Sequence, residues 1–181
     1  TSKCKLMAYR MGETARQFNR YREALPYARA ANDANQVGDK PGSESKGAPC
    51  LDRLPDDADE LNQALGLKPG TITDEVLRND KTGFRAAMYR DKATGRLILV
   101  ARDTQPHSLV DWKTNTDNGA GQDTDQYRAM RVLSGRLYKN GVPFDLAGYS
   151  KGGGLAQEGG LSAPKANVFV FNSAGLHNAS L

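Results

Sequence analysis

The sequence has few of the large apolar side chains that build a deep protein core. Hydrophobic residues make up 38% of the 181 residues and aromatic residues 7%, and the mean hydropathy is -0.64. We therefore expect one core, with part of the chain in polar loops outside it. The longest apolar run, residues 97–101, is too short to cross a bilayer, and no signal peptide is recognisable.

Charge and cysteine are also too sparse to indicate a nucleic-acid-binding or metal-binding protein. The 25 basic and 21 acidic residues give a net charge of +4, and we interpret this excess as spread along the chain. Nucleic-acid binding needs a clustered basic face, which such a distribution does not predict. Cys4 and Cys50 lack metal-ligand spacing, so they form either a disulfide or two free thiols, and no metal is expected.

The first 80 residues are predicted to form helices joined by a polar linker. The first helix has helical spacing of four apolar residues on one face, and Pro26 is expected to kink or split it. Those four residues are Phe18, Tyr21, Leu25 and Ala28. In order, the predicted segments are a helix over 13–34, an exposed linker over 35–49, a helix from Asp56 or Asp57 to Gly66, and a short helix or turn within 71–81.

The pattern then changes to alternating strands and helices, so we place a boundary between residues 1–80 and residues 81–181. The predicted elements are strands over 84–90 and 96–102 joined by a hairpin, an amphipathic helix over 123–139, a strand over 144–147, a helix from Lys151, and a strand over 166–171 buried on both faces. The apolar stripe of the long helix consists of Tyr127, Met130, Leu133, Leu137 and Tyr138, and Asn140-Gly141 ends it. This order predicts an α/β fold, with a mostly parallel sheet, helices on both faces and a helical amino-terminal region before it.

The sequence Gly148-Tyr149-Ser150-Lys151-Gly152 follows a predicted strand and opens a predicted helix. A sharp strand-to-helix turn of this kind exposes a nucleophilic serine, and its crowded backbone requires small residues two positions to either side. The amide of Lys151 would lie at the helix amino terminus, where it can donate to a developing oxyanion. The alternative is a glycine-rich phosphate-binding turn, although Walker A spacing is absent.

Three ordered segments resemble class 3 lipases, closest to a bacterial lipase-like branch with Lys after the serine. Residues 146–156 resemble the nucleophile segment, and residues 168–175 resemble the strand after the nucleophile helix. Between residues 102 and 115 the similar positions are Arg102, Thr104, Asp111, Trp112 and Asn115. The resemblance covers about residues 84–181. It implies an α/β-hydrolase fold that cleaves carboxylic esters of lipids without metal or cofactor, with Thr104 in the oxyanion hole.

The chain departs from this family in ways that bear on catalysis. Asp103 stands where the family has Gly, and Tyr149 replaces the commoner His. The family's catalytic acid and base follow the strand that here ends near residue 172, and no Asp occurs after Ser150. We therefore expect the chain to be a piece of a longer protein, with its acid and base beyond residue 181. His107, His177 and Tyr149 are candidates for lining the site.

The first hypothesis for function is a lipase or phospholipase, secreted from a bacterium as an effector that acts at a membrane surface. Its expected partners are an acyl-ester substrate, an inhibitory immunity protein or a complementary carboxy-terminal fragment, with no nucleic acid. The second hypothesis is another serine esterase or a thioesterase. The third is a hydrolase-like binding domain with an incomplete triad. Substrate, positional specificity, oligomeric state and the role of residues 1–80 stay open.

Overall fold

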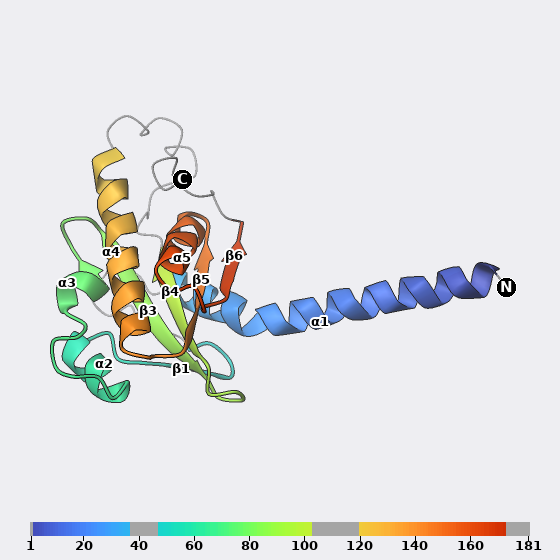
Figure 1. The fold of residues 1–181 in the computed structure, drawn as a ribbon, viewed down its shortest axis with the longest axis horizontal. Coiled ribbons are helices and arrows are strands. Elements are labelled where there is room, and N and C mark those ends of the chain that lie inside the picture. The colour runs from blue at the N-terminus through green and yellow to red at the C-terminus, as the bar shows by residue number, and fades with distance from the viewer. Residues whose placement is uncertain (1, 37–46, 103–119, 173–181) are drawn as a thin grey trace.

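The fold is a six-stranded sheet with helices on both faces and one long helix that projects from it (Figure 1). The computed structural model describes residues 2–36, 47–102 and 120–172. The elements, in order, are α1 (Ser2–Gln36), β1 (Leu51–Arg53), α2 (Ala58–Ala64), α3 (Asp74–Leu77), β2 (Arg78–Asn79), β3 (Phe84–Asp91), β4 (Leu97–Arg102), α4 (Ala120–Lys139), β5 (Phe144–Tyr149), α5 (Lys151–Leu161) and β6 (Val168–Phe171).

The sheet is mixed: only β3 opposes the direction of the other strands, so the predicted mostly parallel sheet holds for strand direction but not for the pairing of neighbours. Its strand order is β1-β3-β4-β5-β6, with β2 also paired to β3. The three strands that pair with β3, namely β1, β2 and β4, run antiparallel to it. The other five strands therefore all run in one direction, although only β4–β5 and β5–β6 are parallel neighbours. The cause is the hairpin between β3 and β4, which reverses the chain before the crossover helices begin.

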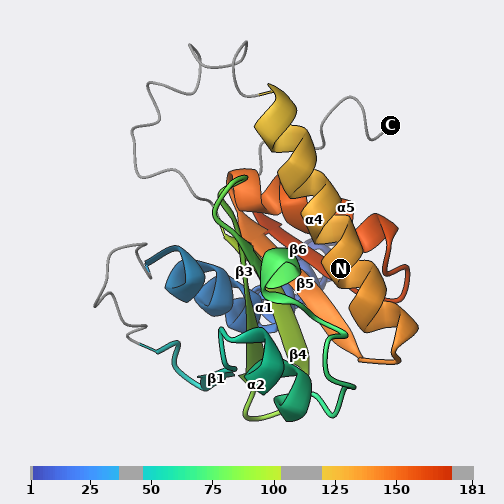
Figure 2. The ribbon, with the colours of Figure 1, turned by 90° about the vertical axis from the view of Figure 1, so that its left-hand side faces the viewer.

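Helices cover both faces of the sheet, as predicted (Figure 2). Alternate strand residues point to opposite faces, because the side-chain period of a strand is two. On one face, residues such as Met88, Leu99 and Leu146 pack with the apolar stripe of α4 and with α5. On the other face, Ile98 and Ala147 pack against the carboxy-terminal part of α1. The strand β5, which leads into the turn before α5, is therefore packed on both of its faces.

The long helix α1 differs from its prediction in extent and in orientation. It begins at Ser2 rather than near residue 13, and it runs without a break through Pro26, so it is not split. The predicted apolar face is exposed at Phe18, Tyr21 and Leu25. The residues of α1 that pack on the sheet are instead Tyr27, Ala30, Ala31 and Ala34. The small alanines let the helix backbone approach the strands closely, which the larger side chains would prevent.

Several local predictions are confirmed. Asp57 caps α2 by accepting hydrogen bonds from the amides of Asp59 and Glu60, and Gly66 follows with a φ of 68°. The hairpin and α3 form where they were predicted. The stripe of α4 is buried, apart from the partly buried Tyr138, and Gly141 ends the helix region with a φ of 74°. Cys50 carries an exposed free thiol, so the disulfide alternative for the cysteines is not formed.

The prediction that the last strand is buried on both faces is wrong. β6 is the edge of the described sheet, and its side chains alternate between exposed and half-buried. An apolar run alone does not distinguish an edge strand from a central one. Among the helices that the structure describes, none is both long enough and apolar enough to pass through a bilayer. The predicted linker lies largely outside the described residues.

A fully buried carboxylate, Asp145 on β5, joins four elements. Its Oδ2 atom accepts hydrogen bonds from Tyr27 Oη (2.6 Å) and Arg96 Nε (2.8 Å), and Arg96 Nη2 lies 2.7 Å away. Its Oδ1 atom accepts from the amide (3.0 Å) and side chain (3.1 Å) of Asn167. A buried charge is tolerated only when it is paired and hydrogen-bonded. Asp145 therefore ties α1, the start of β4 and the segment before β6 to β5.

We expect Tyr27→Phe to lower the free energy of unfolding by about 1–3 kcal/mol, the range for losing a hydrogen bond to a charged group. The phenylalanine keeps the ring that stacks on Phe169, at 3.6 Å between centroids, so only the hydroxyl is lost. Tyr21→Phe, on the exposed part of the same helix, is the matched control. Denaturant titration measures both, and equal stability of the two variants would contradict a role for the Tyr27–Asp145 bond.

The same tyrosine gives this prediction a pH dependence. Burial, reinforced by the hydrogen bond to Asp145, raises the pKa of Tyr27 above its ordinary value. A raised pKa in the folded state means that the stabilisation is complete below the ordinary tyrosine pKa of about 10 and is lost as the pH rises above it. The wild-type chain should therefore lose more stability than Tyr27→Phe on titration into this alkaline range.

Candidate active site

Ser150 is the single residue between β5, which ends at Tyr149, and α5, which begins at Lys151. Its backbone has a φ of 53° and a ψ of -121°, a combination that a side chain normally disfavours. Strained backbone of this kind persists only where the surrounding structure enforces it, and it is concentrated at functional sites. The turn therefore has the strand-to-helix geometry that the sequence motif predicts for a nucleophilic serine.

Gly148 shows why the motif needs glycine two positions before the serine. A Cβ atom built on Gly148 would lie 2.0 Å from the carbonyl oxygen of Gly152 and 2.7 Å from the amide nitrogen of Gly153. Both of these are backbone atoms in the first turn of α5, so no change of rotamer could relieve the clash. The sharp turn at Ser150 is possible only because β5 and α5 approach each other at a residue without a side chain.

Backbone hydrogen bonds hold the turn on both sides. The amide of Ser150 donates to the carbonyl of Phe171 on β6 (3.0 Å), and the carbonyl of Ser150 accepts from the amide of Gly153 (3.0 Å). The side chain of Ser150 is partly exposed and does not cap α5. Within the described part of the chain, its hydroxyl has no hydrogen-bond partner. The Oγ atom is thus presented at the surface by a fixed backbone.

Two further glycines seat α5 tightly against its neighbours. A Cβ on Gly159 would lie 2.6 Å from Ser134 Oγ on α4, and one on Gly160 would lie 2.9 Å from Val168 Cγ2 on β6. These close approaches fix the helix whose amino terminus follows Ser150. The amide of Lys151, the first residue of α5, belongs to the helix end that carries partial positive charge. The position suits the oxyanion role predicted for Lys151, which stays a prediction.

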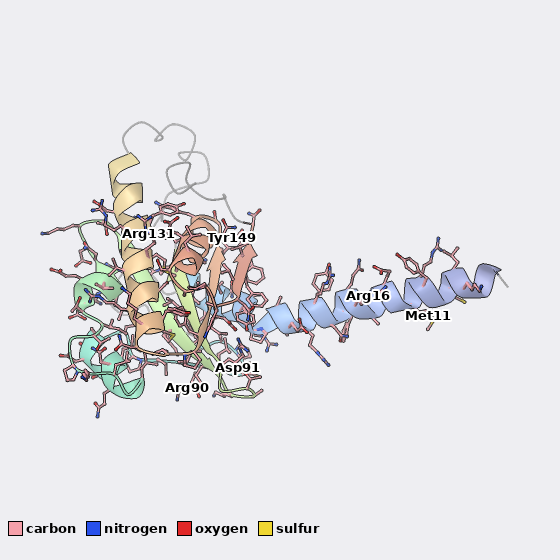
Figure 3. All side chains as sticks on the ribbon, viewed as in Figure 1. Met11, Arg16, Arg90, Asp91, Arg131 and Tyr149 are labelled. Atoms are coloured by element: carbon pink, nitrogen blue, oxygen red, sulfur yellow. The ribbon has the colours of Figure 1, made fainter. Side chains whose placement is uncertain are left out.

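The site lies at the edge of the sheet where three parallel strands end. Gly148 is in register with Ala101 near the end of β4, and Tyr149 is in register with Phe171 at the end of β6. Ligands of α/β sheets bind outside the carboxyl ends of such strands. Figure 3 shows Tyr149 toward this end of the sheet and Asp91 toward the opposite end. The Tyr149 side chain is exposed beside the serine.

Most of the other predicted site residues lie outside the described residues. Thr104 and His107 belong to residues 103–119, which follow β4, and His177 belongs to residues 173–181, which follow β6. Asp103, Asp111, Trp112 and Asn115 are outside the described ranges for the same reason. Both segments follow strands that end beside Ser150 in the sheet. The topology is therefore compatible with their predicted roles, which stay untested.

Glu158 is the only acidic residue after Ser150, and its surroundings indicate a structural role. It is fully buried in α5, and its Oε1 atom lies 3.0 Å from Nη1 of Arg131 on α4, away from the direction of a hydrogen bond. It follows Ser150 by eight residues, about 12 Å along a helix axis. Glu158 therefore pairs two helices rather than orienting a base at Ser150.

The other features that could bind a ligand are not at this edge. A cavity of about 710 Å³ is lined by Thr94, Arg96, Val142 and Phe144 among others, which lie at the amino-terminal ends of β4 and β5. It is therefore at the end of the sheet opposite to Ser150. In the described ranges, no group of three or more His, Cys, Asp or Glu side chains is arranged to hold a metal ion.

Comparison with known proteins gives one family. No curated protein matches the chain. Residues 27–181 match the family model described as "Phospholipase-like: Tle-like phospholipase domain". The match begins at Tyr27, where α1 starts to pack on the sheet, and it includes the whole strand-turn-helix around Ser150. The specific resemblance to class 3 lipases is not part of this finding.

Proposed function

Since the chain belongs to the family of Tle-like phospholipase domains, we propose that it is a serine hydrolase that cleaves carboxylic ester bonds of phospholipids. The observation that carries this proposal is the backbone of Ser150, with a φ of 53° and a ψ of -121°, at the end of β5. A serine of a phosphate-binding turn has no need of such strain. Gly148 and the first turn of α5 enforce it here.

In the proposed reaction, Ser150 Oγ attacks the carbonyl carbon of the ester while a base accepts its proton. The carbonyl oxygen becomes an oxyanion, which the amide of Lys151 and the predicted donor Thr104 stabilise. The ester C–O bond then breaks, the lysophospholipid leaves with a proton, and water hydrolyses the acyl-serine to release the fatty acid. No step uses a metal or a cofactor.

The described residues contain no histidine, the usual base of a serine hydrolase. We place the base and its supporting acid in the segments that follow β4 and β6, with His107 and His177 as candidates, or in sequence that follows residue 181. The division at residue 81 also stays a prediction, and β1 from the first part pairs with β3. Secretion from a bacterium, toxicity and an inhibitory immunity partner stay further proposals.

We expect the protein to release fatty acid from phospholipid vesicles, measured by mass spectrometry, and to retain this activity in EDTA because a serine nucleophile needs no metal. Short-chain soluble esters and an acyl-thioester are assayed in parallel. Turnover of these soluble substrates alone would identify an esterase or thioesterase instead. Release of a phosphorylated headgroup without fatty acid would contradict acyl transfer. No turnover by protein that includes the sequence following residue 181 would favour a binding domain, since the 181-residue chain alone is expected to be inactive if its base lies there.

A further inference from the structure

The helix α1 consists of two parts with different surroundings. From Tyr27 onward it packs on the sheet, where the phenol of Tyr27 donates to Asp145 and Asp33 Oδ2 accepts from the phenol of Tyr89 (2.8 Å). The part before Tyr27 projects away from the domain (Figure 1), and Figure 3 shows Met11 and Arg16 on this part. The projecting part is thus anchored firmly at one end, and no other described segment of the chain packs against it.

The projecting part presents large apolar side chains to solvent. Seven of them are between 44% and 75% exposed, and two of these, Leu6 and Tyr9, lie on other sides of the helix. We call the remaining five the exposed stripe: Met7, Met11, Phe18, Tyr21 and Leu25. At 3.6 residues per turn, they fall within about 80° of one another around the helix axis. Exposed apolar residues that occur singly need no explanation, but a continuous stripe indicates a binding surface.

The projecting part also carries the entire net charge of the chain. Residues 2–25 contain six basic and two acidic residues, out of 25 and 21 in the chain, which leaves 19 of each sign elsewhere. The interpretation that the charge excess is spread along the chain is therefore wrong. The helix geometry places Arg10 on one side of the exposed stripe and Arg22 on the other, with Arg16, Arg20 and both glutamates on the far side.

This combination of charge and shape selects among the surfaces that could cover the stripe. A second copy would bring the same positive charge against it, and no acidic residue flanks the stripe to offset the repulsion. An anionic lipid surface meets both requirements, because it attracts the flanking arginines and accepts the apolar side chains. Tyr21 and Phe18 are suited to the boundary between headgroups and acyl chains.

We propose that residues 2–25 of α1 form an amphipathic helix that binds the surface of membranes rich in anionic phospholipids. The inference rests on the proposed function, since it holds the hydrolase at the surface that contains its substrate. The last residue of the exposed stripe, Leu25, is two residues from Tyr27, which is bonded to the sheet. Binding of the stripe to the membrane therefore holds the whole domain in place, because no flexible segment separates the two.

Binding is tested with Ser150→Ala protein, so that the lipid stays intact, by co-sedimentation with phosphatidylcholine vesicles that do or do not contain phosphatidylglycerol. We expect binding only to the anionic vesicles, and weaker binding as salt is raised. Phe18→Ser combined with Tyr21→Ser should weaken it at least tenfold. Leu161→Ser, which removes an exposed leucine from α5, is the matched control and should bind as the parent does.

Four outcomes would overturn the proposal. Three concern vesicles: equal binding to neutral vesicles, no binding to either kind, or equal binding by the double variant and the control. The fourth is a dimer of the parent protein in light scattering without lipid, with the double variant monomeric. The same variants, with Ser150 intact, are assayed on vesicles and on a soluble ester. Loss on vesicles alone supports membrane docking. Binding without turnover of either substrate by the intact chain would contradict the proposed function and leave the docking surface standing.

Discussion

Replacing Ser150 with alanine is expected to lower the rate of fatty-acid release by on the order of 10⁶, the scale on which loss of a serine nucleophile acts in hydrolases. The reason is that Oγ forms the covalent bond to the acyl group, and no other described hydroxyl is presented by the strained turn. A fluorophosphonate probe should add one adduct to the intact mass of the wild type and none to Ser150→Ala. Ser162→Ala, at the other end of α5, is the matched control and should keep both signals.

The free energies of unfolding of Ser150 variants distinguish a strained nucleophile turn from an ordinary loop. Glycine adopts a φ of 53° without strain, so Ser150→Gly should be more stable than Ser150→Ala by about 1 kcal/mol and equally inactive. Denaturant titration measures the difference. Labelling that persists in Ser150→Ala would place the nucleophile elsewhere. Equal stability of the glycine and alanine variants would mean that the backbone strain at this position is absent.

Local chemistry was readable from the sequence because its causes lie within a few residues. The turn at Ser150 needs glycine at position 148, whose Cβ would collide with the next helix, so the motif encodes its own geometry. The cap at Asp57 and the stop at Gly66 work in the same way. The buried stripe of α4 follows from helical spacing of large apolar residues. Each of these predictions used residues that act on their own element or on the next one along the chain.

The predictions that failed concern which parts of the protein pack against a given helix or strand. Helical spacing placed Phe18 and Tyr21 on one face of α1, but spacing alone could not show that this face lies in solvent. The apolar residues of α1 that are buried against the sheet are Tyr27 and three alanines that follow it. The two-face burial expected of residues 166–171 fails at β6, because exposure depends on whether another strand lies beside it. Asp145 gave no signal either, since its partner Tyr27 is 118 residues away.

Gly148→Ala is expected to be the most destabilising single substitution at the site, with a loss of about 3–5 kcal/mol in the free energy of unfolding or a failure to fold. The added Cβ would lie 2.0 Å from the Gly152 carbonyl oxygen, and only a movement of β5 or α5 could separate them. That movement would also displace Ser150. Any folded Gly148→Ala protein should therefore show greatly slowed fluorophosphonate labelling.

Two other glycine-to-alanine variants calibrate this effect because their surroundings differ in a graded way. A Cβ on Gly135 in α4 meets only Ser162 Cβ at 3.7 Å, so Gly135→Ala should be neutral or gain up to about 1 kcal/mol from helix propensity. A Cβ on Gly159 would meet side-chain atoms of Ser134 and Met130, which can shift, so Gly159→Ala should cost about 1–3 kcal/mol. Thermal or denaturant unfolding of the three variants should thus rank Gly135→Ala above Gly159→Ala above Gly148→Ala. A contradicting result would be a Gly148→Ala protein as stable and as readily labelled as Gly135→Ala. It would show that β5 and α5 do not approach as closely as this turn requires. The assignment of Ser150 as the nucleophile would then lose its geometric basis.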